Sequence, residues 1–316
     1  MLKPMRHFLF VFLLAFSMPG FAAATVCAPP LKLHTPEMTQ AAIRNARDHG
    51  FLWRISKDGH TSYLYGTIHV AKFEWMFPGP LVMKALQQSD TVALEMDLLD
   101  EDIRSRMFEA MQMMRRIVLP AALAKRMQLQ SEAVCIPYAS IANLAPELQV
   151  TTLTMMMGHQ DGLEGEYALD AALAVIGHKE KKNMVSLETP EMQLQILEME
   201  NPQETIAFVE DSLDELESGR SFSMLKRISW LWADSDYGEM DKFETWCECL
   251  NTENERELMK RALDDRNPVL AENIDALHKS GKQVFAAVGS LHMFGPVGLP
   301  GLLQKRGYKV ERVAFK

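Results

Sequence analysis

The apolar positions of this chain follow two different periods, and each period predicts a different kind of element. Short, nearly continuous apolar runs are typical of buried strands, whereas apolar residues three and four positions apart are typical of amphipathic helices. Two strand-like runs flank Asp58-Gly59, a dipeptide that favours tight turns, so residues 51–66 are predicted to form a hairpin. The other predicted strands are residues 91–97, 183–188, 282–289 and 308–315.

Helices are predicted between these strands, and several begin with the same local signal. A polar residue that can cap a helix precedes a proline, which suits the first helical position. This pair occurs at Thr35, Thr189, Asn201 and Asn267, and the first of these helices is expected to run to Gly50. The other predicted helices cover residues 78–90, about 100–180, about 190–280 and 298–307.

Two segments share one order of elements. A strand leads into GTIH at residues 66–69, and another leads into GSLH at 289–292; a loop, a helix and a strand follow each. This order predicts a two-copy strand–GxxH–helix–strand repeat. Alternating strands and helices predict an α/β fold with a central, mainly parallel sheet, an antiparallel hairpin at one edge and many flanking helices. No linker separates the two copies, so residues 25–316 are expected to form a single domain.

The first 24 residues are typical of a secretory signal peptide. Lys3 and Arg6 precede an apolar run over residues 8–16, and small residues at 22–24 offer a cleavage site near Ala24. The apolar run is too short for a spanning helix. We therefore expect a secreted, periplasmic protein with no membrane span in its mature chain.

Charge and cysteine content narrow the expected partners and the compartment. The formal net charge is -9, which argues against a nucleic-acid partner. Export to an oxidising compartment favours disulfides. We expect Cys27 to pair with Cys135, because a bond between Cys247 and Cys249 would be strained.

Polar side chains follow four of the predicted strands at the point where each strand ends. In an open α/β sheet, the carboxyl ends of the strands form the ligand crevice. We therefore expect His69, His292, Glu95 and Glu188 to face one pocket. A single histidine at such a position often only binds a backbone carbonyl, and Glu188 could simply favour a helix N-terminus. Two histidines in matched settings favour a functional site.

The residue types at this predicted site suit a divalent metal ion. His69, His292 and Glu95 are candidate ligands for Mn²⁺, Co²⁺ or Zn²⁺ with open positions. Such an ion could activate water and polarise a carbonyl, while a remaining carboxylate acts as a general base. Arg266 could reach a carboxylate in the crevice, clamp a substrate anion or face solvent.

Several stretches of the sequence resemble the TraB/GumN family. They are YLYGTIHVA, VALEMD, VSLETPEMQLQIL, DDRNPVLAENI and FAAVGSLHMFGPVGLPGLLQKRGYKVERV, and the resemblance covers about residues 45–314. The family is related to the Tiki proteases and, more distantly, to erythromycin esterases and the haem-binding ChaN proteins. The resemblance implies an α/β fold with both GxxH motifs at one site and a metal-dependent hydrolase activity.

The same resemblance assigns roles to residues of this chain. It implies that His69 and His292 are the motif histidines and that Glu95 is their acidic partner. Arg266 and Asn267 match the family's Arg-Asn pair, and Glu188 matches its Leu-Glu-Thr segment. These four residues, Glu95, Glu188, Arg266 and Asn267, are thus the candidate catalytic groups.

Three functional hypotheses follow. The leading one is an exported metal-dependent hydrolase, a peptidase of Tiki type, acting on a peptide or a small-molecule substrate. The second is a protein that binds haem, a metal or a peptide without catalysis. The third is a metal-free esterase in which a histidine acts as the base. No oligomeric state is predicted.

Overall fold

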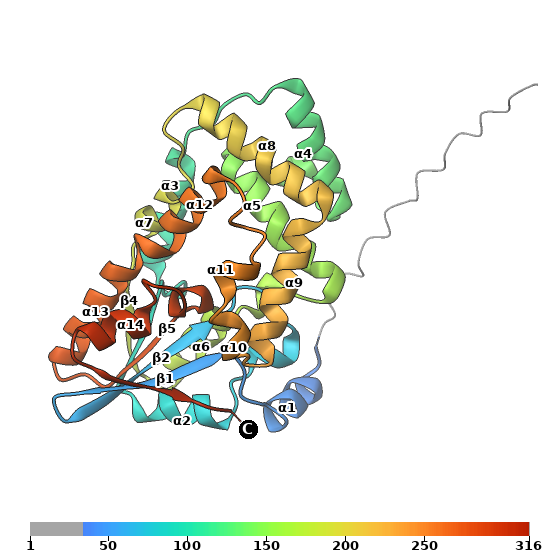
Figure 1. Cartoon of the computed structure of the whole chain (residues 1–316). Helices are drawn as coiled ribbons and strands as arrows, with labels where there is room; N and C mark the ends of the chain where they lie inside the picture. The colour runs from blue at the N-terminus through green and yellow to red at the C-terminus, as the bar shows by residue number, and fades with distance from the viewer. Residues whose placement is uncertain (1–33, 316) are drawn as a thin grey trace, which may run out of the picture.

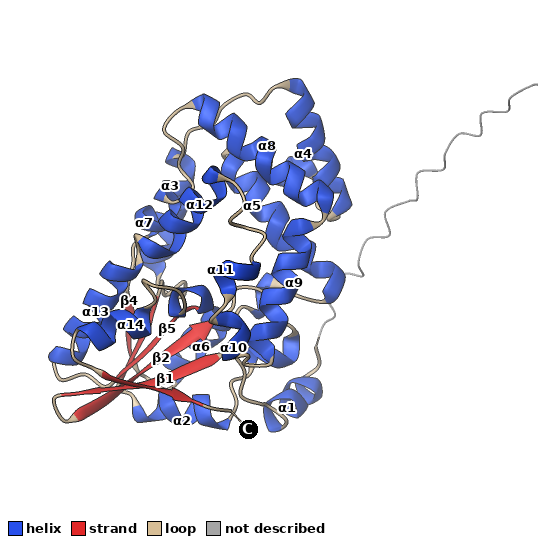
Figure 2. Ribbon diagram, viewed as in Figure 1, coloured by secondary structure: helices blue, strands red, loops and turns tan. Residues whose placement is uncertain are grey.

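A computed structural model describes residues 34–315 as one α/β domain built on a six-stranded sheet (Figures 1 and 2). The predicted signal peptide and Cys27 lie outside the described residues. The strands are β1 (Phe51–Lys57), β2 (His60–Thr67), β3 (Thr91–Leu94), β4 (Asn183–Ser186), β5 (Val284–Gly289) and β6 (Lys309–Val313).

Helices make up most of the remaining chain. They are α1 (Pro36–Arg44), α2 (Pro80–Gln88), α3 (Glu101–Met113), α4 (Ala121–Ala133), α5 (Pro146–Met156), α6 (Leu169–Lys179), α7 (Pro190–Gln195), α8 (Pro202–Ser218), α9 (Arg220–Ala233), α10 (Tyr237–Met240), α11 (Phe243–Trp246), α12 (Glu253–Met259), α13 (Asn267–Lys279) and α14 (Leu299–Lys305). Within residues 34–315, none of the helices has the length and apolar character that crossing a membrane requires.

The strand order is β4-β3-β5-β2-β1-β6. β4, β3, β5 and β2 pair in parallel, whereas β1 is antiparallel to both β2 and β6. The predicted α/β class, the mainly parallel sheet and the hairpin are therefore confirmed. The hairpin strand β1 is not outermost, because β6 pairs with its free side and forms the edge. Asp58 and Gly59 form the predicted turn, and both have positive φ values, of 52° and 84°.

The order of the strands explains which helices cover which face. The chain moves one way along the sheet from β2 to β3 to β4, and the opposite way from β4 to β5 to β6. Because crossovers between parallel strands are right-handed, helices of the first set cover one face and helices of the second set cover the other. Accordingly, α6 packs on β3 and β4, whereas α13 packs on β5 and α14 on β6.

Two insertions form a helical layer beyond the sheet (Figure 1). The first, α3 to α5, follows β3, and the second, α8 to α12, follows β4 and α7. Within the second, α10 and α11 pack into the core of the sheet instead. α4 and α5 both pack on α8 around a small core of their own. Its fully buried members are Met127, Leu153, Val209 and Leu213. The helical layer is therefore joined across the two insertions, even though they are far apart in sequence.

The two segments predicted to be a repeat have the same order of elements in the structure. A short 3-10 turn follows the motif strand in each: η1 (Phe73–Met76) after β2, and η6 (Ser290–Met293) directly after β5. A helix and a strand complete both segments. That they are two copies of one unit stays a prediction.

Most of the predicted helix starts are confirmed by side-chain contacts. Thr35 and Thr189 each accept a hydrogen bond from the backbone N–H three residues later, and Asn201 caps α8 in the same way. The first helix ends at Arg44 instead of Gly50. Between these two positions, Asp48 accepts hydrogen bonds from the N–H groups of Leu81 and Val82, so this stretch makes tertiary contacts in place of helical ones.

The expectation that strain would prevent a bond between Cys247 and Cys249 was wrong, whereas the predicted pairing of Cys27 with Cys135 stays a prediction. Cys247 and Cys249 are joined by a disulfide, with their Cα atoms 5.1 Å apart. That separation lies inside the usual range for a disulfide. Cys135 is also disulfide-bonded, and the predicted partner Cys27 lies outside the described residues.

Candidate functional site

The candidate site lies where the sheet changes its direction of connection. β5 lies between β3 and β2. The chain leaves β5 toward one side of the sheet, whereas it leaves β3 and β2 toward the other side. In open α/β sheets, adjacent strands with divergent connections leave a crevice at their carboxyl ends. GTIH begins in the last two residues of β2, GSLH begins at the last residue of β5, and Glu95 directly follows β3. The topology therefore brings both histidine motifs and the acid to one crevice.

The two motifs touch each other through glycine. An ideal side-chain carbon on Gly66 would lie only 3.1 Å from Cα of Ser290. A larger residue at position 66 would push the GSLH turn away from the end of β2. Gly66 also accepts a hydrogen bond at its carbonyl from the buried Trp232 indole, at 2.8 Å. The close approach of the motifs thus requires this glycine.

Gly289 lies at the centre of the site. A carbon placed at its missing side-chain position would lie 3.2 Å from Glu95 Oε1, 3.4 Å from His69 Nε2 and 3.7 Å from His292 Cδ2. The Gly289 N–H donates to Glu95 Oε1 at 2.6 Å, and His292 Nε2 lies 3.9 Å from that same oxygen. Both imidazoles and one carboxylate therefore border the space beside Gly289.

The two predicted glutamates are held together by two donors. Arg266 Nη2 lies 2.8 Å from Glu95 Oε2 and 2.5 Å from Glu188 Oε2, and its Nε donates to Glu188 Oε1 at 2.8 Å. Gln193, on α7, donates its amide to Glu95 at 2.9 Å and to Glu188 at 3.1 Å. This cluster joins the ends of β3 and β4 to α7 and α13.

The two histidines are oriented by different partners. His69 Nδ1 lies 2.8 Å from Asp170 Oδ2, and His292 Nδ1 lies 2.6 Å from Asn267 Oδ1. Because the partner atoms are oxygen acceptors, each Nδ1 carries the donated proton. Nε2 of each ring is therefore the atom left free to face the crevice.

Asn267 does not have the structural role that the sequence suggested. It is the first residue of α13, and its side chain binds His292 instead of capping the helix. Asn267 is 1% exposed and His292 is 3% exposed, so the pair is sealed inside the protein. Asn267 is therefore part of the candidate site.

Burial and charge push the titration of the histidines apart. The negative charge of Asp170 raises the pKa of His69 to about 9, whereas burial lowers the pKa of His292 to about 4. Burial opposes ionisation of Glu95, but the two imidazoles, Arg266 and the Gly289 N–H together lower its pKa to about 2. The His69 side chain is 57% exposed, so solvent screens its ion pair with Asp170.

The ligand atoms face one another without forming a closed metal cage. Over residues 34–315, no set of three or more His, Cys, Asp or Glu side chains is gathered closely enough to hold a metal ion as it stands. The chemistry of the two histidines nevertheless fits a metal, since histidine ligands generally donate their second ring N–H to an oxygen acceptor. His69 and His292 both have this second partner.

Comparison with known proteins identifies the family. Residues 51–312, which make up most of the chain, match the TraB/PrgY/gumN family. The chain belongs to that family. The resemblance seen in the sequence is thus confirmed, and both GxxH motifs of this TraB/PrgY/gumN protein lie inside the matched residues. No curated protein and no solved structure matches the chain at a significant level.

Sequence reasoning missed two residues of the site in this TraB/PrgY/gumN protein, Asp170 and Gln193. Asp170 lies in the first turn of α6, where an acidic residue is already explained by the helix dipole. Gln193 lies in the first turns of α7, within a stretch that reads as an ordinary amphipathic helix. Neither had a local signal that pointed to the crevice.

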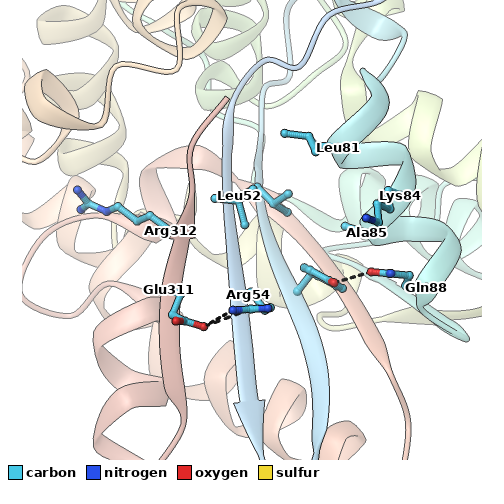
Figure 3. Close-up of a pocket in the computed structure, with 10 residues that line it drawn as sticks. Leu52, Arg54, Leu81, Lys84, Ala85, Gln88, Glu311 and Arg312 are labelled. Atoms are coloured by element: carbon cyan, nitrogen blue, oxygen red, sulfur yellow. Dashed lines mark hydrogen bonds and ion pairs between the residues drawn. The ribbon is translucent and has the colours of Figure 1, made fainter. Parts of the chain in front are cut away.

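A separate groove lies on the sheet, away from the site. It has a volume of about 470 Å³ and runs between α2 and the strands β1 and β6. Figure 3 shows Arg54 on β1 paired with Glu311 on β6, while Lys84 lies apart from this pair on α2. None of the predicted site residues lines this groove, so it is not part of the candidate site.

Proposed function

We propose that this chain is a metal-dependent hydrolase whose reaction takes place beside Gly289. The single observation that carries the proposal is the pair of histidines with their Nδ1 atoms bound by Asp170 and Asn267. That arrangement leaves both Nε2 atoms directed to one space bordered by Glu95. Membership of the TraB/PrgY/gumN family is consistent with this proposal but does not specify an activity.

In this proposal each residue of the site has a separate role. His69 and His292 would hold the metal through Nε2, and Glu95 is the nearest carboxylate. A bound divalent ion supplies Lewis acidity toward water and a carbonyl group. Arg266 and Gln193 hold Glu95 and Glu188 in place, which keeps the acidic groups oriented without a substrate. Gly289 leaves room for a substrate atom close to the imidazoles.

The experiment combines metal binding with cleavage. Purified protein is assayed with a peptide library in the presence of Mn²⁺, Co²⁺ or Zn²⁺, beside His292→Ala and His69→Ala. We expect metal-stimulated cleavage in the wild type and a loss of at least a hundredfold in either variant. Equal cleavage by wild type and His292→Ala would contradict the proposal. Tight peptide or haem binding without any product would favour a binding protein instead.

A second candidate is a metal-free esterase. It is favoured by the hydrogen bonds of the carboxylates, because Glu95 and Glu188 both already face Arg266 and Gln193. In this mechanism His292, oriented by Asn267, would take a proton from water while His69 donates a hydrogen bond to the developing oxyanion. Full activity toward an ester in excess chelator would select this candidate over the metal-dependent one.

We also propose that the protein acts outside the cytoplasm. The support is the sequence of residues 1–24, with its basic start, apolar run and small residues before Val26. N-terminal sequencing of protein recovered from the periplasm should give a first residue close to Thr25. A chain that keeps Met1 and stays in the cytoplasm would contradict export.

A further inference from the structure

Asp170 binds two residues of the first GxxH motif at once. Its Oδ1 accepts a hydrogen bond from Thr67 Oγ1 at 2.6 Å, and its Oδ2 accepts one from His69 Nδ1 at 2.8 Å. Asp170 comes from the first turn of α6, more than a hundred residues after the motif. The contacts therefore tie the end of β2 to a helix that begins far along the chain.

Thr67 makes this carboxylate a rigid support. Thr67 is fully buried at the end of β2, where the sheet fixes its backbone beside β5. Its hydroxyl consequently holds one carboxylate oxygen in place while the other points at the imidazole. The corresponding hydroxyl residue of the second motif, Ser290, instead packs against Gly66. Thr67, the second residue of GTIH, thus holds the Asp170 carboxylate, whereas Ser290 in GSLH contacts Gly66.

The His69 ring depends on Asp170 more than His292 depends on Asn267. His292 is 3% exposed, so surrounding atoms hold its ring as well as its hydrogen bond does. The His69 side chain is 57% exposed, so packing restrains it much less. An exposed ring can turn about its side-chain bonds, and a charged hydrogen bond is the restraint that remains.

We propose that Asp170 is a positioning residue, which through its bond to Nδ1 keeps Nε2 of His69 directed at the space beside Gly289. The orientation of the His69 ring does not depend on a reaction. Only the expected effect on metal affinity rests on the proposed function. Carboxylates behind histidine ligands generally raise metal affinity by fixing the ring and its tautomer. Asp170 does not touch the reacting space and is not a catalytic residue.

The first test observes the ring directly. In ¹⁵N-labelled protein without metal or substrate, we expect His69 to show a hydrogen-bonded Nδ1–H signal. Asp170→Ala should abolish that signal, whereas Asp170→Asn, whose amide oxygen can still accept one bond, should retain part of it. Asp170→Asn also keeps the test valid if the alanine variant fails to fold. An unchanged His69 signal in both variants would overturn the proposal.

The second test measures the consequence. Titration with Mn²⁺ or Zn²⁺ should give a dissociation constant roughly 10- to 100-fold higher in Asp170→Ala than in the wild type. Equal constants would overturn the proposed effect on binding. Since the spectra need no metal, they still test the position of His69 if hydrolysis or metal binding is absent.

The matched control lies on the same helix. His178 is also on α6 and pairs with Asp97, with its Nε2 2.6 Å from Asp97 Oδ2. His178→Gln removes an Asp–His pair from α6 without touching Asp170. It should leave the His69 signal and the metal affinity unchanged. Loss of the His69 signal in this control would mean that α6 as a whole, and not Asp170, holds the ring.

Discussion

The site requires a glycine at position 289, which has no side chain. Gly289 has a φ of -49°, which any residue can adopt, so backbone strain does not explain its presence. What requires glycine is the space between Glu95 and His69, which an added carbon would enter at 3.2 and 3.4 Å. At the residue scale, the geometry of the site therefore depends on the space that Gly289 leaves open between Glu95 and His69.

Gly289→Ala should damage the site more than the fold. The added methyl must displace Glu95 or His69 by a few tenths of an ångström, which we expect to cost about 1 kcal/mol of stability. The rate, measured as kcat/KM, should fall about tenfold or more. Gly301→Ala is the control, because its methyl meets no neighbouring atom within 4 Å. That control should stabilise α14 by roughly 0.5–1 kcal/mol.

Glu188→Gln should destabilise the protein strongly for a single-atom change. The Glu188 side chain is 1% exposed, and its loss of charge leaves the buried Arg266 with Glu95 as its remaining anionic partner. We expect a loss of about 3 kcal/mol, measured by chemical denaturation. Glu191→Gln breaks a similar Arg–Glu pair, with Arg106, but that pair is exposed. A loss of stability for Glu191→Gln as large as that for Glu188→Gln would contradict the role of burial.

At the scale of elements, the sequence predicted what local chemistry decides. The proline-led helix starts and the Asp58-Gly59 turn depend on neighbouring residues, and the structure has them. Asn267 shows the limit of such reasoning. Its sequence setting is that of a helix cap, yet its side chain binds His292, 25 residues away. A long-range partner can replace a local one without leaving a trace in the neighbouring sequence.

The contact between Glu215 on α8 and Glu255 on α12 should respond to pH. Burial, together with a hydrogen bond and the negative charge of Glu255, raises the pKa of Glu215 from 4.5 to about 7. The folded state thus keeps a proton that the unfolded state releases. The stability due to this carboxyl is full below pH 4.5 and is lost as the pH rises through about 7.

Thermal unfolding of Glu215→Gln tests that sign. The variant cannot ionise at this position, so its Tm relative to wild type should rise as the pH passes from 4.5 through about 7. Arg220 and Ser221 also face Glu215 and stay unchanged. Glu210→Gln, an exposed change on the same helix, is the control for replacing a carboxyl by an amide. A flat difference for Glu215→Gln would contradict the assignment.

At the scale of the whole molecule, the α/β class was predictable but the strand order was not. Apolar runs identify strands such as residues 284–289, yet every buried strand of this kind can pair with any other. The convergence of His69 and His292 could be predicted because both follow strands at one end of the sheet. Asp170 could not be, because which helix starts beside β2 depends on the order of all the strands.

The helical layer should open more easily than the sheet. Leu213 is fully buried in the separate core between α4, α5 and α8, so Leu213→Ala removes about 2–5 kcal/mol from that layer. Amide exchange should accelerate in these helices before it does in β2 and β5. Leu64→Ala, in the core of β2, is the comparison and should accelerate exchange in the sheet as well. Identical exchange patterns would contradict two separable cores.

The position of β5 has a consequence for how the protein is made. This strand is near the end of the chain, yet it lies between β3 and β2, which are near the beginning. A ribosome has therefore synthesised almost every other element before the middle of the sheet can be filled. Until then β2 and β3 have no common neighbour, and the two GxxH motifs cannot meet. A premature stop before residue 284 would therefore remove β5 from the middle of the sheet, and not only an element at its edge.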